Sequence, residues 1–174
     1  MATTVLAAWL EGDTLIVANA GDSRAYLIND RGIEPLTVDA DLGCTLLAAG
    51  SPPENVVELG HVIRALRSCV GGVLYKSATE ELVIDDARFR LAVSRWKLLP
   101  NETVILCSDG LVEEGAFLEP AELQDLVRRH ADLSVEDLAA ALADAAEAHQ
   151  IVPCDEEPDG LGDNISCCVI RIRA

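Results

Sequence analysis

LIVANAGDSRAYLI, residues 15–28, joins two apolar stretches through the four residues Gly-Asp-Ser-Arg. Residues 15–20 and 25–28 have the composition of buried strands, and Gly21 lets the backbone turn sharply between them. An acid and a guanidinium at such a junction require an explanation, because both are costly to bury without partners. The junction is therefore the first candidate functional segment of the chain.

The apolar stretches around this junction predict an antiparallel meander. Another short apolar run, residues 5–9, precedes it and is separated from residues 15–20 by a Glu-Gly-Asp turn. After a further turn, residues 33–38 are expected to add a strand and residues 42–49 a short helix. Residues 51–100 have weak periodicity, and we expect loops and short elements there, with one strand at 90–93.

Two helices are expected in the C-terminal half. Pro120 suits the first position of a helix, and Glu122 is favourable in its first turn. Ser134 and Asp137 form a candidate capping box for a second helix. The apolar stripe of this second helix comprises Val135, Leu138, Leu142, Ala145 and Ala146.

A buried strand precedes these helices and another follows them. Residues 103–107 are a compact apolar strand that runs into Ser-Asp-Gly, and residues 150–158 are expected to form a loop. Residues 165–172 predict the last strand, and its expected inward-facing residues are Ile165, Cys167, Val169 and Ile172. The order of strands, then helices, then a strand favours an α+β fold.

Composition and charge limit the classes of function. The chain has 174 residues, half of them hydrophobic, which fits one domain over residues 1–174. Thirteen basic residues against 30 acidic ones give a net charge of −17 without a basic cluster, so we expect no nucleic-acid partner. No apolar run is long enough to span a bilayer and no signal-peptide pattern begins the chain, so we expect a cytoplasmic protein without a membrane partner. An anionic substrate would need a cation at the site to overcome the negative field.

The cysteines and histidines do not indicate a zinc or redox site. The six cysteines form no C-x-x-C pair, and the three histidines are far apart in sequence. Cys107 lies two residues before Asp109 but has no Gly/Arg cradle for a phosphate around it. We expect it to be a buried thiol rather than a nucleophile.

Three acids share a position at the end of an apolar strand: Asp22, Asp109 and Asp163, each flanked by glycine. Two carboxylates within about 5 Å repel each other by roughly 3 kcal/mol at an effective dielectric near 20. A cluster of them requires a compensating ion, and Mg²⁺ or Mn²⁺ suits carboxylate oxygens. The alternative is that Asp-Gly and Asp-Asn simply form tight turns. The residues alone leave both interpretations open.

The stretches LIVANAGDSRAYLI, VILCSDGLVE and GLGDNISCCVIRI together resemble three signatures of the metal-dependent serine/threonine phosphatases of the PP2C (PPM) type, in the order and roughly the spacing of that family. The resemblance implies an α-β-β-α sandwich, with two packed antiparallel β-sheets flanked by helices. It implies a binuclear Mg²⁺/Mn²⁺ centre in which Asp109 and Asp163 resemble ligands, while Asp22 resembles the acid that holds a third, weaker ion. Arg24 can pair with a neighbouring acid, but a surface role is equally reasonable, so we leave it out of the site.

The activity implied by the resemblance is hydrolysis of phosphoserine or phosphothreonine in a protein substrate. Two ions that share a water lower its pKa and present it in line with the phosphate ester, so no covalent phosphoenzyme is needed. The resemblance does not indicate which protein is the substrate.

The sequence departs from the family at its N-terminal side. An early acidic pair, a D-G-x-G-G segment and an upstream phosphate-binding arginine are absent from residues 1–174. We therefore expect a partial domain with weak or no activity by itself. It is either a truncated form of an active phosphatase, an inactive regulatory or partner-binding module (a pseudophosphatase), or a chain completed by another chain or by further domains.

Overall fold

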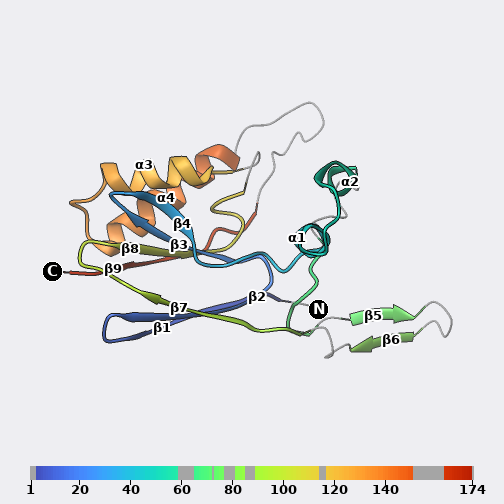
Figure 1. Cartoon of the computed structure of the whole chain (residues 1–174). Coiled ribbons are helices and arrows are strands. Elements are labelled where there is room, and N and C mark those ends of the chain that lie inside the picture. The colour runs from blue at the N-terminus through green and yellow to red at the C-terminus, as the bar shows by residue number, and fades with distance from the viewer. Residues whose placement is uncertain are drawn as a thin grey trace. The chain divides into compact units, whose positions relative to one another are not determined.

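The computed structural model describes residues 3–58, 65–71, 73–76, 81–84, 89–113, 117–150 and 163–173. Contacts divide the chain into two compact units. The first comprises Met1–Ser23 and Thr37–Trp96, and the second comprises Arg24–Leu36 and Lys97–Ala174. Figure 1 labels their helices and strands. The expectation of a single domain stays a prediction.

The first unit is built on a sheet in the order β1-β2-β7, formed by β1 (Val5–Glu11), β2 (Thr14–Ala20) and β7 (Ala92–Lys97). β1 and β2 are an antiparallel hairpin, and Gly12 at its turn has φ +61°, a conformation that favours glycine. Leu15 and Val17 on one face of β2 are buried and the residues between them are half-buried, an alternation typical of a strand with one covered face.

Short elements account for the rest of the first unit. α1 (Leu42–Ala48) begins at Asp41, whose carboxylate accepts a hydrogen bond of 2.6 Å from the Cys44 backbone N–H. The sequence predicted this helix, and the strand expected at 90–93 overlaps β7. It predicted short elements over residues 51–100 but did not place the following ones. These are α2 (Pro53–Val57) and the antiparallel hairpin of β5 (Val73–Lys76) and β6 (Glu81–Ile84).

The second unit is built on a four-stranded sheet in the order β4-β3-β8-β9, in which every neighbouring pair is antiparallel. Its strand β8 is buried at all five positions, as expected of a strand with a neighbour on each side and both faces covered. The four strands are β3 (Arg24–Asn29), β4 (Gly32–Pro35), β8 (Thr103–Cys107) and β9 (Cys167–Arg171).

The expected meander through residues 5–28 is wrong, because β3 belongs to a different sheet from β1 and β2. The backbone changes direction at Gly21, which has φ +115°. A Cβ there would lie 2.7 Å from the Cβ of Thr4 and closer still to its methyl group, so no other residue fits. β3 then pairs with β8 and β4, and its residues 25–28 are all buried. The polar junction therefore marks a change of sheet.

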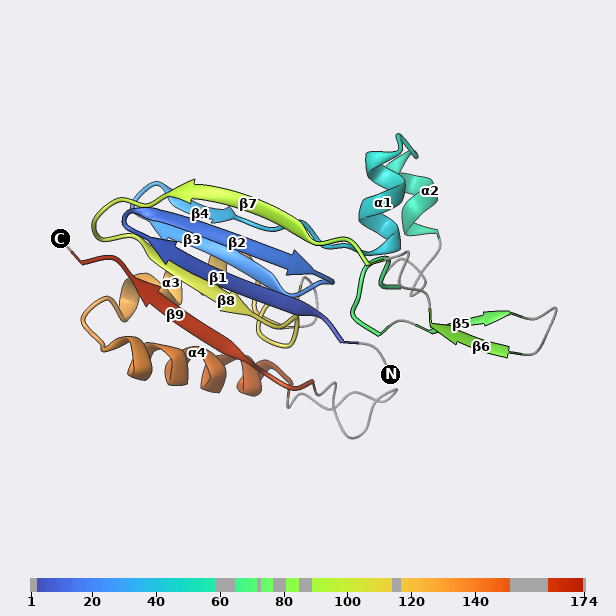
Figure 2. The ribbon, with the colours of Figure 1, turned by 90° about the horizontal axis from the view of Figure 1, so that it is seen from below.

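Two helices lie side by side on one face of the four-stranded sheet (Figures 1 and 2). α3 (Pro120–Arg129) contacts β4, α4 (Val135–Gln150) contacts β9, and the helices contact each other. Both predicted helix starts are confirmed. The Glu119 N–H donates to the Glu122 carboxylate at 2.9 Å, and the Ser134 hydroxyl accepts from the Asp137 N–H at 3.0 Å.

The apolar stripes of these helices form the core of the second unit. Its fully buried helical residues are Leu123, Leu138, Leu142 and Ala146. On the last strand, the expected inward-facing residues Ile165, Cys167 and Val169 pack against this core. The antiparallel sheets with their helices confirm the predicted α+β fold class. The loop expected at 150–158 lies outside the described residues, except for Gln150, which ends α4. Within the described part of the chain, no helix has the length and apolar character needed to cross a membrane.

Candidate metal centre

Asp109 lies in a tight turn that directly follows β8. The Leu111 N–H donates to the Ser108 carbonyl at 3.2 Å and closes the turn. The half-buried Asp109 carboxylate accepts a hydrogen bond of 3.1 Å from the Gly110 N–H. The buried strand β8 thus ends in a turn that presents a carboxylate.

Asp163 lies on the segment that leads into β9, next to the turn of Asp109. The exposed Asp163 carboxylate accepts from the Asn164 N–H at 2.7 Å. Ser108 joins the two segments, since its N–H donates to the Ser166 carbonyl at 3.0 Å. The Ser108 hydroxyl donates to the Asn164 carbonyl at 3.1 Å and accepts from the Ser166 N–H at 3.0 Å. Antiparallel pairing of β8 with β9 therefore continues past the strand ends.

The closest approach of the two segments is at Gly110. A Cβ at this position would lie 2.6 Å from the carbonyl oxygen of Asn164 and 3.3 Å from the Cβ of Asp163. The first distance is too short for any side chain, so the contact requires glycine. The structure thus brings the Asp109 and Asp163 segments into direct contact.

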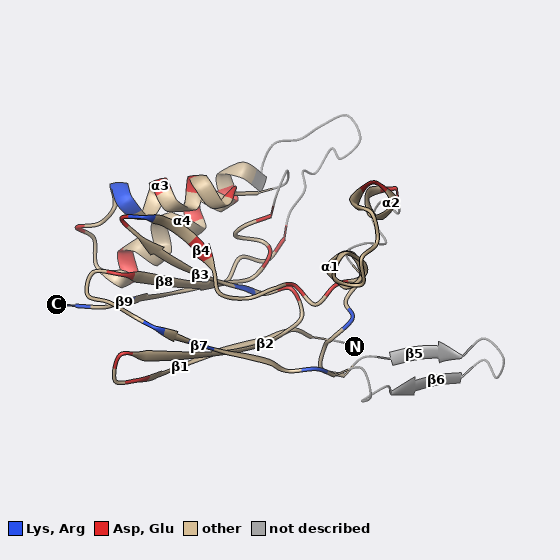
Figure 3. Cartoon of the chain, viewed as in Figure 1, with Lys and Arg blue, Asp and Glu red and all other residues tan. Residues whose placement is uncertain are grey.

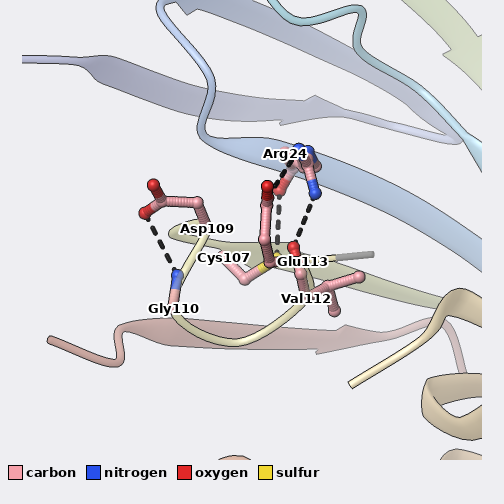
Figure 4. A network of polar contacts seen from close by, with 6 residues as sticks. All are labelled: Arg24, Cys107, Asp109, Gly110, Val112 and Glu113. Carbon is pink, nitrogen blue, oxygen red and sulfur yellow. Dashed lines mark hydrogen bonds and ion pairs between the residues drawn. The ribbon is translucent and has the colours of Figure 1, made fainter. Parts of the chain in front are cut away.

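Arg24 contacts the same turn from β3, as Figure 4 shows. Its Nη1 donates to the Val112 carbonyl at 2.6 Å, and its Nη2 forms an ion pair of 3.0 Å with Glu113. The Cys107 thiol donates to the Arg24 carbonyl at 3.6 Å. Sequence reasoning left Arg24 out of the site, and its partner lies 89 residues away. The signal that could have found the pair is an arginine after one acidic turn and a glutamate after the other.

Asp22 lies in the first unit, in the turn that follows β2. This turn is fixed locally, because the Ala40 N–H donates to the Gly21 carbonyl at 2.9 Å and the hydroxyls of Thr4 and Ser23 are 2.9 Å apart. Asp22 itself is half-buried. Its convergence with Asp109 and Asp163, which belong to the other unit, stays a prediction.

The donors brought together suit a hard cation in type. Carboxylate and carbonyl oxygens are the ligands that Mg²⁺ and Mn²⁺ prefer. Among the residues that the structure describes, no three His, Cys, Asp or Glu side chains group closely enough to hold an ion. Cys107 is 4% exposed, which confirms the expectation of a buried thiol.

Comparison with protein families decides the assignment. Residues 40–173 match the family described as Stage II sporulation protein E (SpoIIE), and residues 1–44 match Protein phosphatase 2C. The chain belongs to the SpoIIE family and is of the PP2C type. This confirms the PP2C resemblance, although the motifs quoted above did not indicate the SpoIIE family.

Relatives of this SpoIIE/PP2C chain include the serine/threonine phosphatase stp of Listeria welshimeri, which is 28% identical over 77% of the chain. The chain spans 47% of that relative, about half the length of the curated proteins it matches. The S. agalactiae serine/threonine phosphatase structure has a TM-score of 0.73 at 20% identity, over 99% of this chain and 60% of that one. The catalytic domain of PstP, solved with two manganese ions, has a TM-score of 0.62 at 22% identity, over 97% and 58%. These structures share the fold.

Proposed function

We propose that Asp109 and Asp163 are ligands of a Mg²⁺ or Mn²⁺ centre in a protein serine/threonine phosphatase, and that this chain forms part of its catalytic domain. The observation that carries the proposal is the contact at Gly110. There the two acidic segments lie so close together that no side chain larger than that of glycine fits between them. The family assignment supports it, as do the phosphatases named among the relatives. PstP binds two manganese ions, which supports the choice of metal.

The chain's own residues would bind and orient the metal rather than react. The Asp109 and Asp163 carboxylates supply oxygen ligands, and Ser108 fixes the separation of the segments that carry them. Asp22 is proposed to hold a third, weaker ion. The metal, when bound, supplies a water of lowered pKa and a clamp for the transferring phosphoryl group.

The proposed substrate is a protein that carries phosphoserine or phosphothreonine. The chain has a net charge of −17, so its long-range field repels a phosphate. Divalent ions at the site would reverse that field locally. Metal binding would therefore be needed for the approach of the substrate as well as for its hydrolysis.

The test measures metal binding and turnover separately. Mn²⁺ is titrated calorimetrically into this chain and into a longer version extended upstream in the source gene, and hydrolysis of a phosphopeptide is followed for both. We expect weak Mn²⁺ binding and little turnover for the 174-residue chain, since two carboxylates fall short of the octahedral set that such ions prefer. The longer version should turn over, and Asp109→Ala should abolish turnover and weaken Mn²⁺ binding.

The second candidate is an inactive regulatory or partner-binding module. Such a module would keep the contact at Gly110 without using it to hold a metal. In that case, Asp109→Ala would leave Mn²⁺ affinity unchanged in both versions, and neither would hydrolyse the phosphopeptide. That result would replace the phosphatase proposal for this chain.

A further inference from the structure

The turn that carries Asp109 is tied to β3 on both sides of the acid. Before the acid, the Cys107 thiol donates to the Arg24 carbonyl, and Cys107 is the register partner of Arg24 in the sheet. After the acid, the guanidinium of Arg24 bonds to the Val112 carbonyl and pairs with Glu113. One residue of β3 therefore contacts both ends of the turn in which Asp109 lies (Figure 4).

The chemistry of these contacts specifically requires arginine. Two nitrogens of one planar guanidinium reach two different acceptors, a carbonyl at 2.6 Å and a carboxylate at 3.0 Å. A lysine ammonium is a point charge without this fork. The side chains of Arg24 and Glu113 are only 20% and 14% exposed, so salt screens the pair less than an exposed one.

A second arginine of the same sheet also donates to loop carbonyls, away from the turn of Asp109. Arg171 on β9 donates to the carbonyls of Ala131 and Leu133, at 2.9 and 2.7 Å. Its register partner is Thr103, four residues before Cys107 along β8, or about 13 Å away. Arg24 and Arg171 thus hold loop carbonyls in similar ways, but only Arg24 holds the turn of Asp109.

We propose that Arg24 is a positioning residue for the metal-binding carboxylate of Asp109, and that it acts through its bonds to Val112 and Glu113. The proposal rests on the function proposed above and adds a residue to it. Groups that orient metal ligands change metal affinity about 10–100-fold when they are removed. A contact with a stabilising role alone would lower the melting temperature without this change.

The experiment compares Arg24→Gln with Arg171→Gln in the 174-residue chain. Both variants remove one guanidinium and one positive charge, and both disrupt contacts to backbone carbonyls. Melting temperature and Mn²⁺ affinity are measured for each, with Asp109→Ala as the reference for loss of a ligand. We expect both arginine variants to melt at lower temperature, and Arg24→Gln alone to weaken Mn²⁺ binding, by at least about tenfold.

Two further variants identify the contacts through which Arg24 acts. Glu113→Gln should weaken Mn²⁺ binding in the same direction, and the Arg24→Gln/Glu113→Gln double variant should add little to Arg24→Gln, because both remove one ion pair. Arg24→Lys should recover only part of the affinity, since it restores the charge but not the fork.

The outcomes separate this inference from the proposed function. If Asp109→Ala leaves Mn²⁺ affinity unchanged, the proposed metal centre is wrong. If Asp109→Ala weakens binding but Arg24→Gln weakens it no more than Arg171→Gln does, the centre stands and the positioning role of Arg24 is overturned. Full recovery by Arg24→Lys would reduce its role to charge alone and would also overturn the inference.

Discussion

Different kinds of contact hold the two ends of the four-stranded sheet against the neighbouring segments. Beyond Cys107 and Cys167, the chain segments meet backbone to backbone, and at Gly110 no room is left for a methyl group. At the Thr103 end, long side chains span the gap between sheet and helix and leave a cavity of about 210 Å³. A larger residue should therefore destabilise the first end, and a shorter side chain should destabilise the second.

The two ends also differ in their charged side chains. The tightly closed end carries the carboxylates of Asp109 and Asp163 together with the Arg24–Glu113 ion pair. The cavity at the other end is lined by Arg128, Arg171 and Asp30. Arg128 donates to the carbonyls of Asn29 and Asp30, at 3.2 and 3.0 Å. Figure 3 shows basic residues at the C-terminal end of α3, where cations complement the helix dipole. The arginines at the cavity end thus bind loop carbonyls, and the proposed metal ligands lie at the other end.

The largest expected effect is that of adding one methyl group at the closed end. Gly110→Ala would place a Cβ 2.6 Å from the Asn164 carbonyl oxygen, a backbone atom that the Ser108 hydroxyl holds in place. We expect a loss of about 3 kcal/mol in the free energy of unfolding, the upper range for overpacking. Denaturant unfolding measures it, and Mn²⁺ titration should show weaker binding because the acidic segments are forced apart.

Gly12→Ala is the matched control for Gly110→Ala. A Cβ at Gly12 meets nothing within 4 Å, but φ there is +61°, so the cost is left-handed backbone strain of about 1–2 kcal/mol. Mn²⁺ binding should not change. Equal losses of stability in the two variants, or unchanged Mn²⁺ affinity in Gly110→Ala, would contradict the interpretation of the closed end.

The next effect in size is that of removing the hydroxyl that joins the two acidic segments. Ser108→Ala leaves the Ser166 N–H without its hydroxyl acceptor and the Asn164 carbonyl without its donor. We expect a loss of about 1.5 kcal/mol, the upper end of the net contribution of a hydrogen bond, because Asn164 and Ser166 are exposed and water can solvate the released groups. Ser134→Ala, which removes the cap of α4, should cost about 1 kcal/mol. Only Ser108→Ala should weaken Mn²⁺ binding, and equal affinities for the two variants would argue against a role of the Ser108 hydroxyl in holding the acidic segments together.

The sequence predicted the elements of these two ends better than it predicted their contacts. β8, α3 and α4 follow from local patterns: an apolar run, a proline at a helix start, a serine cap and an apolar stripe. The change of sheet at Gly21 does not, because the partner of β3 lies about 80 residues further along the chain. Local patterns contain no information on which of several apolar strands will pair.

The sequence predicted the acids of the candidate site but not the contacts that hold them in place. Asp109 and Asp163 stand out beside glycines at strand ends, which is a local signal. The crowding at Gly110 and the bonds of Arg24 depend on segments that are more than 50 and 80 residues apart. An isolated Asp-Gly pair has the same sequence whether the glycine serves a turn or a close approach, so only the fold distinguishes the two.

At the Thr103 end of the sheet, the expected effect is smaller and is confined to the C-terminus of α3. The shorter side chain of Arg171→Gln can no longer donate hydrogen bonds to the carbonyls of Ala131 and Leu133, which follow α3. We expect a loss of about 1 kcal/mol, because water can solvate the carbonyls that are released. Hydrogen exchange should accelerate in the last turn of α3 and stay unchanged in the Ser108 turn. Faster exchange at both ends would mean that the ends are not independent.

The smallest effect concerns Cys167, which lies on β9 at the closed end and faces α4. Burial raises the pKa of the Cys167 thiol above its ordinary value, and the neighbouring Cys168 adds to the increase. The thiol also donates to the Ala139 carbonyl at 3.4 Å, a bond that requires the protonated form. Since folding favours the protonated thiol, its contribution to stability is complete below the unfolded pKa and is lost as the pH rises through the higher folded value. Melting temperatures between pH 8 and 11 should therefore fall slightly more steeply for the wild type than for Cys167→Ala. The control variant Cys168→Ala, at an exposed position, should keep most of the wild-type slope. Identical slopes for the wild type and Cys167→Ala would mean that the thiol is not desolvated in the folded state and that α4 covers this end of β9 less closely than the structure indicates.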